Sequence, residues 1–533
     1  MIAAAALLLV LVVSGLLILK GRQGRAEKLP EMTLTVFLFG VKPEGFDEVV
    51  EEAEKRLQDS LNVSLNFEFT TPSDYKPTLK MELMAGRKIA LAYDAPWMSN
   101  NELVSSGMYY DLQDYFNNDA YPGLKKAFSG ELVEANKIDG HLYWIPVMGV
   151  EKDMVMLYIR EDLREELGVE PVTDMATLEQ YLVAVKEAYP DMVPMDLGRK
   201  GFYEFFNDDV LLRNRAGIFE PSGTGNMELY WEVAVSEDGK TCLGATTYGD
   251  PDQAFSNYPE GYRYNYYPER FRKFREWNAY LVENSITVTT PSGYDSQDTF
   301  INGDAAVCIG TLSRGSIEGE LREKVPEGKV SFFPLYEKQR QMQEGAVFSA
   351  HIANNFLGVP VTAGEEQKER TMLFLDWLFR DEANYRLFRY GIEGRDYEVT
   401  EDGRFTVENA VNRYAFPYYE MVWNSQYELQ NRNTPEILVK YQEYMDREST
   451  YEDSPLTGFV YNSSRVKTEL VAVNQEYSKI WFQLFHGTLD DVEQALDVYY
   501  QNARKVGLEK IREDLIRQVQ DFLDRRGNGN KSE

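Results

Sequence analysis

Strand-like and helix-like segments alternate at the start of the polar part of this chain. Residues 33–39 form an apolar run rich in β-favouring side chains, 46–61 have the apolar spacing of an amphipathic helix, and 63–69 alternate apolar and polar residues. A helix through 79–86 and a third apolar run at 89–93 continue the order. This alternation predicts an α/β fold with a doubly wound, mostly parallel sheet.

The same alternation returns later in the chain. The chain has 533 residues, whereas one domain usually has about 100 to 200. We therefore expect two large, interleaved α/β lobes. Residues 489–523 have a mostly helical pattern, which predicts extra helices at the C-terminus. The later strand-like and helix-like runs lie at 143–146, 154–159, 161–167, 300–310, 330–333, 356–361 and 373–379, and the apolar stripe of the last helix contains Leu508, Ile511, Leu515, Val519 and Phe522.

One edge of the first sheet is a predicted binding site. Ligands of doubly wound sheets gather beyond the carboxyl ends of the strands. The third apolar run ends near Tyr93, so residues 94–101 lie at that edge, and they include Asp94 and Trp97.

The charge and aromatic content limit the partners. The chain has 56 basic and 87 acidic residues and a net charge of −31, so most of its surface repels nucleic acids and anionic membranes. We therefore expect no nucleic-acid partner. Half of the aromatic residues are tyrosines, 35 in number. Tyrosine combines an apolar ring with a hydrogen-bonding hydroxyl, which suits surfaces that hold polar ligands.

Cysteine and histidine are too sparse for a disulfide scaffold or a zinc site. Cys242 and Cys308 are far apart, and Cys308 lies in an apolar run that predicts a buried thiol. His141, His351 and His486 are scattered and form no metal-binding motif. We expect no metal and no cofactor.

Residues 1–28 are predicted to be a membrane anchor or an export signal. The eighteen residues Ile2–Leu19 carry no charge and are long enough for a short membrane-spanning helix. The basic residues that follow, Lys20, Arg22 and Arg25, would place the body in the cytoplasm by the positive-inside rule. The long, tyrosine-rich and cysteine-poor body is instead typical of exported proteins, so we expect it at the extracellular face of the membrane.

Five short segments carry a resemblance to a known family. They are Ile138–Pro146, Leu157–Leu163, Phe300–Gly303, Met372–Phe379 and Tyr390–Gly394. In this order they resemble the extracellular solute-binding proteins of ABC sugar transporters, of the maltodextrin-binding type and its large Gram-positive lipoprotein branch. Ser454–Phe459 and Ala503–Gly507 resemble a domain of unknown function that ends many of these proteins. The chain departs from the family in lacking a lipobox cysteine.

This resemblance implies a type II periplasmic-binding-protein fold, in which two lobes close on a ligand about a hinge. The first lobe is then expected to contain residues 32–150 and 353–390. The second is expected to contain 151–352 and 391–533, including the C-terminal helical extension. The implied crossings between the lobes lie near 149–154, 349–355 and 390–394.

The resemblance also implies a function. The chain is expected to bind an oligosaccharide, without catalysis, and to deliver it to the permease subunits of an ABC importer. We expect it to act as a monomer, attached to the membrane or exported through its N-terminal segment.

Five residues are candidate ligand contacts. A sugar presents apolar faces and hydroxyl groups, so its site needs aromatic rings together with carboxylate, amide or guanidinium groups. Trp97 and Trp423 match positions where the family places sugar-stacking aromatics, and Asp94 lies beside the first of them. Glu151 matches a polar sugar contact of the family, and Arg314 is placed to donate paired hydrogen bonds to hydroxyls.

Other functions remain open on the sequence. A glycoside hydrolase would use two carboxylates in an aromatic cleft, but no nucleophile elbow, Walker loop or complete dinucleotide-binding motif is present. A sensory or adhesive ectodomain would share the fold without a permease. A peptide-binding protein would need charged pockets for the peptide termini.

Overall fold

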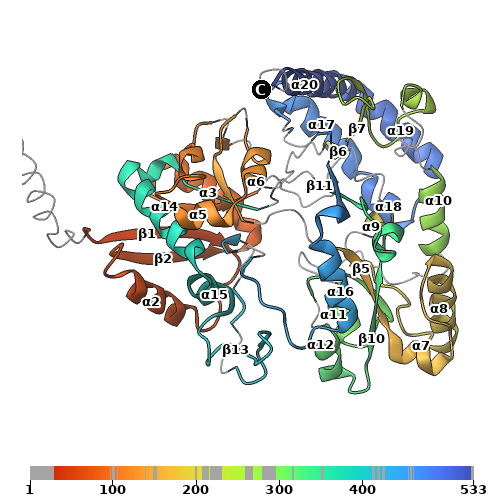
Figure 1. Ribbon diagram of the computed structural model, residues 1–533. Helices are drawn as coiled ribbons and strands as arrows, with labels where there is room; N and C mark the ends of the chain where they lie inside the picture. Colours follow the sequence, from red (N-terminus) through yellow and green to blue (C-terminus); the bar gives the residue numbers. More distant parts are fainter. Residues whose placement is uncertain are drawn as a thin grey trace, which may run out of the picture.

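The molecule has two lobes that lie side by side (Figure 1). The structure is a computed structural model. It describes residues 29–529 except 96–97, 99–102, 105, 139, 148–152, 199–200, 207–214, 217–230, 259–267, 279–295, 315–316, 350–352, 354, 411–413, 417–419, 423–425, 454, 457–458 and 460.

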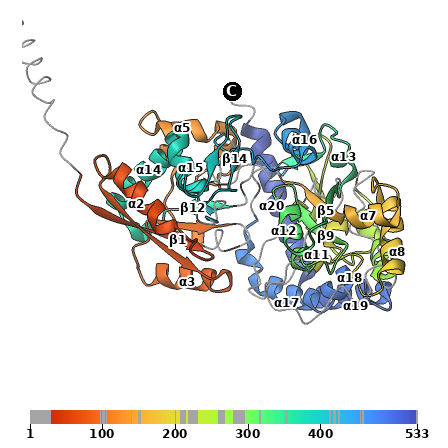
Figure 2. The same cartoon turned by 90° about the horizontal axis from the view of Figure 1, so that it is seen from below.

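The first lobe is built on a five-stranded sheet. Its strand order is β2-β1-β3-β12-β4, in which β2, β1 and β3 are parallel and β12 is antiparallel to both of its neighbours. Helix α3 covers one face, and α2, α14 and α15 cover the other (Figure 2). The elements are β1 (Met32–Phe39), α2 (Phe46–Leu57), β2 (Val63–Thr70), α3 (Pro72–Met84), β3 (Leu91–Asp94), α5 (Pro122–Ala127), α6 (Gly130–Ala135), β4 (Trp144–Pro146), β12 (Phe356–Gly358), α14 (Glu365–Arg380) and α15 (Glu382–Tyr390).

Burial explains why these segments fold as they do. All four residues of β3 are buried, as expected for a central strand covered on both faces. Helix α2 buries Phe46, Val49, Ala53 and Leu57, which recur at the three- and four-residue spacing of one helix face. The predicted α/β order and the mostly parallel sheet are therefore confirmed in this lobe.

The sheet of the second lobe differs from the predicted mostly parallel arrangement. Its order is β10-β5-β9, and β5 is antiparallel to both neighbours. Strand β5 carries the chain in from the first lobe and runs away from it, whereas β9 and β10 run back toward it. The elements around this sheet are β5 (Val155–Arg160), α7 (Glu161–Leu167), α8 (Met175–Ala188), α10 (Pro268–Trp277), α11 (Ser296–Ile301), β9 (Val307–Thr311), α12 (Ile317–Lys324) and β10 (Val330–Pro334).

The hydrophobic cores show where the chain passes between the lobes. The core residues change lobe between Val147 and Met154 and again between Val347 and Ala353. The third change lies later than the predicted 390–394, between Tyr427 and Leu438.

The segment before this third crossing packs in the first lobe. Phe416, Met421, Val422 and Tyr427 all belong to its core, because Phe416 stacks on Phe46 and the Tyr427 hydroxyl donates to the Phe379 carbonyl. The predicted assignment of everything from 391 onward to the second lobe is thus corrected for this segment.

Two short strands that are far apart in the sequence pair with each other. Strand β11 (Val347–Ser349) is parallel to β15 (Tyr451–Asp453), with Val347 opposite Tyr451. Figure 1 shows β11 near the middle of the molecule, at the side of the second lobe that faces the first.

The C-terminal helices form a layer on the second lobe. They are α16 (Glu436–Met445), α17 (Lys467–Ser478), α18 (Trp481–His486), α19 (Val492–Lys505) and α20 (Leu508–Gly529). The predicted apolar stripe of the last helix is buried at Leu508, Ile511, Leu515 and Val519. The long predicted helix is divided, because Gly507 has a φ of +117° and lies against Glu469, where a Cβ would approach the Glu469 Cγ to 2.4 Å.

The small sheet β6 (Arg215–Ala216), β7 (Trp231–Val235) and β8 (Cys242–Thr246) lies under α20. In the part of the chain that the structure describes, no helix is both long enough and apolar enough to cross a membrane. The predicted anchor or signal segment, 1–28, lies outside that part.

Candidate functional site

The strands of the first lobe end at an edge that faces the second lobe. Phe356, at the start of β12, pairs with Asp94 at the end of β3 and with Pro146 at the end of β4. Two crossings join this edge, one after Pro146 and one before Phe356. We call Phe39, Asp94, Pro146 and Phe356 the first-lobe edge.

The second lobe presents a matching edge. Val155, at the start of β5, pairs with Thr311 at the end of β9, and Pro334 at the end of β10 pairs with Met156. We call Val155, Thr311 and Pro334 the second-lobe edge. The carboxyl ends of β1, β3 and β4 in the first lobe, and of β9 and β10 in the second, therefore lie at these two edges, and α/β proteins bind ligands beyond such strand ends.

Asp94 lies where the sequence predicted, but its side chain is engaged inside the first lobe. It is 1% exposed, and its Oδ2 accepts a 2.8 Å hydrogen bond from the Tyr109 hydroxyl. Its Oδ1 accepts from the backbone N–H of Ala95 at 2.8 Å. Burial and the nearby Asp94 raise the pKa of Tyr109 well above its usual value, so Tyr109 remains a donor. In this structure Asp94 holds the edge together.

Other polar groups stiffen the same edge. The Tyr93 hydroxyl donates to Asn355 Oδ1 at 2.6 Å, which ties β3 to the segment that returns from the second lobe. The Tyr75 hydroxyl lies 2.8 Å from the carbonyl oxygens of both Phe37 and Tyr93. Buried hydrogen bonds of this kind fix the positions of side chains around a site.

Glu420 is a buried carboxyl group at the first-lobe edge that was not predicted. Its Oε2 accepts a 3.1 Å hydrogen bond from the backbone N–H of Phe39, at the end of β1. Among the described residues, no hydrogen-bond partner lies near its buried Oε1. Burial raises the pKa of Glu420 to about 9, so the group is protonated and uncharged at neutral pH.

The second-lobe edge carries a polar cluster that joins the first crossing to the end of β9. The two carboxylate oxygens of Asp153 accept hydrogen bonds from the backbone N–H of Ser313 at 3.0 Å and from its hydroxyl at 2.7 Å. Thr311 Oγ1 lies 3.0 Å from the Ser313 hydroxyl. Hydroxyl and carboxylate groups of this kind match the hydroxyls of a sugar.

Arg314 follows this cluster directly. Its Nη2 lies 3.0 Å from Glu320 Oε2, and the two side chains are 35% and 39% exposed. The guanidinium is therefore partly exposed. A group that donates hydrogen bonds to sugar hydroxyls must be exposed in this way.

Three of the predicted contacts, Trp97, Glu151 and Trp423, lie outside the described residues. Ala95 and Val422, which lie close to Trp97 and Trp423 in the sequence, belong to the first-lobe core. Of the predicted set, Asp94 is thus placed on one edge and Arg314 on the other.

Glu420 and Asp153 were missed because their partners Phe39 and Ser313 are 381 and 160 residues away along the chain. The sequence did contain one signal for Glu420, because it is an acidic residue inside the aromatic run 418–423.

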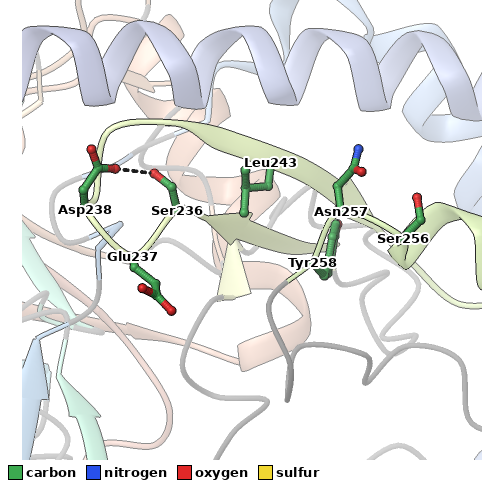
Figure 3. Close-up of a pocket in the computed structure, with 7 residues that line it drawn as sticks. All are labelled: Ser236, Glu237, Asp238, Leu243, Ser256, Asn257 and Tyr258. Carbon is green, nitrogen blue, oxygen red and sulfur yellow. Dashed lines mark hydrogen bonds between the residues drawn. The ribbon is translucent and has the colours of Figure 1, made fainter.

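A hollow of about 530 Å³ lies in the second lobe. Figure 3 shows its lining, which comes from the turn between β7 and β8 and from the residues after the 3-10 turn Asp252–Phe255. It contains none of the residues of the two edges. The lining residues are Ser236, Glu237, Asp238, Leu243, Ser256, Asn257 and Tyr258.

Metal-binding clusters are not found in the described part of the chain. No three His, Cys, Asp or Glu side chains there are grouped to hold a metal ion. Cys308 is buried, as predicted, and Cys242 is partly buried.

We expect Tyr109→Phe to destabilise the first lobe. The change removes the donor to a buried carboxyl group, which costs about 1–3 kcal/mol of unfolding free energy. Urea unfolding measures this loss. Tyr121→Phe is the matched control, because its hydroxyl makes an exposed 3.1 Å contact with Glu369. Equal midpoints for the two variants would contradict the role given to Asp94.

The fold belongs to the class of two-lobe α/β folds. Residues 455–524 also match the family model described as "Domain of unknown function (DUF3502)", as the C-terminal motifs predicted.

Two proteins of similar sequence have names that describe carbohydrate-binding proteins. A carbohydrate ABC transporter substrate-binding protein of Streptococcus pneumoniae is 21% identical, over 92% of this chain and 91% of its own length. The polygalacturonan/rhamnogalacturonan-binding protein YtcQ of Bacillus subtilis is 23% identical, over 67% of this chain and 65% of its own.

Solved structures show the same fold. The N-glycan transport solute-binding protein NgtS of Streptococcus pneumoniae superposes with a TM-score of 0.69 at 17% identity, covering 93% of this chain and 99% of NgtS. The alginate-binding protein AlgQ2 superposes with a TM-score of 0.57 at 16% identity, covering 92% and 98%. The chain is thus similar to carbohydrate-transport proteins in general. It is not specifically similar to the maltodextrin-binding type.

Proposed function

We propose that this chain is the extracytoplasmic substrate-binding component of a carbohydrate ABC importer. It binds an oligosaccharide between its lobes and delivers it unchanged to the permease. The observation that carries this proposal is the pair of opposed edges, at which β1, β3 and β4 of the first lobe and β9 and β10 of the second lobe end. The similarity to the carbohydrate ABC transporter substrate-binding protein over 92% of the chain supports it.

Closure about the hinge brings the two edges together on the sugar. The three crossings and the β11–β15 pair lie between or beside the lobes, so a rotation there leaves both cores intact. Asp153, Ser313 and Arg314 then contact sugar hydroxyls from the second lobe. Trp97, Glu151 and Trp423 are proposed as further contacts, and Asp94 acts by holding the first-lobe edge.

The protein binds and releases its ligand without chemistry. Among the described residues, the Asp94 carboxyl group accepts from Tyr109, Glu420 is buried, and Asp153 accepts from Ser313. A glycosidase needs both carboxyl groups exposed to the sugar.

We further propose that the N-terminal segment holds the protein at the extracellular face of the membrane, where it acts as a monomer. The apolar stretch Ile2–Leu19 supports the attachment. The permease subunits of the importer are its protein partners.

A thermal-shift screen tests the binding function. An oligosaccharide at a concentration of 100 times its Kd stabilises the folded state by about 2.7 kcal/mol, so the melting temperature rises. We expect a rise with a set of oligosaccharides, none with a matched set of peptides, and no new reducing ends after incubation. A rise with peptides alone, or release of reducing ends, would overturn the proposal.

A further inference from the structure

We propose that the C-terminal domain of unknown function, residues 455–524, is a splint for the second crossing between the lobes. It holds the end of strand β15, which pairs with β11, the strand that leads into this crossing. The inference rests on the proposed function only in treating that crossing as part of a hinge. Its basis is a series of contacts that runs from α20 to β11.

The pair formed by β11 and β15 is too short to be stable by itself. Each strand has three residues, and even longer two-stranded ribbons are marginally stable in water. The strands are parallel, so their last residues, Ser349 and Asp453, lie opposite each other. Ser349 is also the last described residue before the second crossing, because Ala353 already belongs to the first-lobe core. A contact that holds the end of β15 therefore also holds the start of the crossing.

The opposite end of the pair is held by the residues around α16. The backbone N–H of Gly345 donates to the Ser449 carbonyl at 2.8 Å, and the Tyr444 hydroxyl donates to the Gln343 carbonyl at 2.6 Å. These bonds lie before the first residues of the two strands. They fix the end that is farther along the chain from the crossing.

The chain that leaves β15 is held by α20. The carbonyl of Pro455, two residues after the strand, accepts a 3.1 Å hydrogen bond from Arg526. The side-chain amide of Gln518 bridges the backbone of Asn462, because it accepts from the N–H at 2.9 Å and donates to the carbonyl at 2.8 Å. Residues 455–462 are thus attached to the helix at both of their ends.

Two side-chain contacts strengthen this attachment. The Tyr461 hydroxyl donates to Asp514 Oδ2 at 2.9 Å, and the ring of Phe459 packs edge-on against that of Phe522, with 5.6 Å between the centroids. The helix residues that make the four contacts are spaced four apart, at 514, 518, 522 and 526. This spacing places them along one side of α20, facing the chain that leaves β15.

A splint must itself be fixed, and α20 is fixed to the second lobe. Its apolar stripe is buried in the core of that lobe, and Arg512 is paired with the buried Asp250. Gln520 accepts from the N–H of Cys242 at 2.9 Å and donates to the carbonyl of Lys240 at 3.0 Å. Figure 1 shows α20 along the top of the second lobe, with its C-terminal end toward the first lobe. The domain therefore joins the body of the second lobe to the strand pair at the crossing.

Hydrogen exchange read by mass spectrometry on the full chain, without ligand, tests this inference. Gln518→Ala removes both bonds to the backbone of Asn462. We expect exchange in peptides that cover β11 and β15 to become about tenfold faster than in the wild type, equivalent to about 1.4 kcal/mol of opening free energy. Exchange in β5 should remain that of the wild type, because the core of the lobe is unchanged.

Gln520→Ala is the matched control. Both glutamines bridge a backbone N–H and a carbonyl, and both also donate to a carboxylate four residues away on α20, Asp514 for Gln518 and Asp524 for Gln520. The control should leave exchange in β11 and β15 unchanged. If Gln518→Ala does not fold, Tyr461→Phe gives the same comparison by removing one hydroxyl.

Two results would overturn the inference. One is equal acceleration of β11 and β15 in both glutamine variants. The other is faster exchange that stays confined to residues 455–462 in Gln518→Ala. Because no ligand is added, either result leaves the importer function standing, and a failed oligosaccharide screen leaves the splint standing.

Discussion

Replacing Arg512 with alanine is expected to lower the unfolding free energy of the second lobe by about 3–5 kcal/mol, because it leaves a buried carboxylate without its partner. Arg512 belongs to α20, in the C-terminal layer of helices. Its guanidinium makes two hydrogen bonds to the fully buried Asp250, at 2.7 Å and 2.8 Å. Removal of one partner of a buried pair costs far more than removal of an exposed pair.

The surroundings of Arg512 increase the expected effect. The side chain also donates to the carbonyl of Ala245 in β8 and lies over the ring of Trp231 in β7, 5.1 Å from its centroid. Burial alone would lower the pKa of Arg512, but Asp250 and Glu509 outweigh it and raise the pKa, so the guanidinium stays charged. Arg512 therefore links α20 to β7 and β8, together with Gln520, which bonds the backbone of Lys240 and Cys242.

Denaturant unfolding followed by tryptophan fluorescence measures the loss. The control is Lys510→Ala, on the same helix, whose ion pair with Glu469 is 57% exposed on the lysine side. Such a surface pair contributes about 0–1 kcal/mol. Equal losses in the two variants would contradict the view that α20 is held to the second lobe through Arg512.

The fold of the first lobe could be predicted because each of its strands and helices has its own pattern in the sequence. Strand β1 and helix α2 each carry their own periodicity, so their order and the parallel sheet followed from residues 33–93. The direction of β5 relative to β9 could not be predicted in this way. It depends on which lobe the chain comes from, which no local pattern records.

The third crossing was misplaced for a similar reason. The glycine-containing turn at 390–394 ends a helix, which is a local signal for a boundary. The segment after it nevertheless returns to the first-lobe core through Phe416 and Tyr427, whose partners Phe46 and Phe379 are distant in sequence. Packing between distant residues decided the boundary.

The candidate site shows the same contrast between local sequence patterns and contacts between distant residues. The position of Asp94 at the end of β3 followed from strand topology, but the hydrogen bonds that bury it do not appear in the sequence. The Tyr109 hydroxyl donates to its carboxyl group, a contact between residues 15 apart in the sequence. Glu420 acquires its properties only where it meets the end of β1.

Glu420→Gln is expected to remove a strong pH dependence of stability from the first lobe. Burial raises the pKa of Glu420 from its ordinary 4.5 to about 9 in the folded chain. Between these values the folded state holds a proton that the unfolded state releases, so stability falls as the pH rises. The limiting slope is about 1.4 kcal/mol per pH unit. We expect the melting temperature of the wild type to fall between pH 5 and 9 through this group.

Glutamine keeps the acceptor for the Phe39 N–H but cannot ionise, so the variant should lose this slope and be the more stable protein at pH 9. Melting curves at pH 5, 7 and 9 measure the difference. The control is Glu51→Gln, which removes a charge from the exposed face of α2, where Glu51 is 71% exposed. Burial raises the pKa of Tyr75, and Asp94 and Glu420 raise it further; Tyr75 and Asp94 remain in each variant. A slope in Glu420→Gln equal to that of the wild type would show that Glu420 is already ionised when folded, and that the first-lobe edge carries a buried charge.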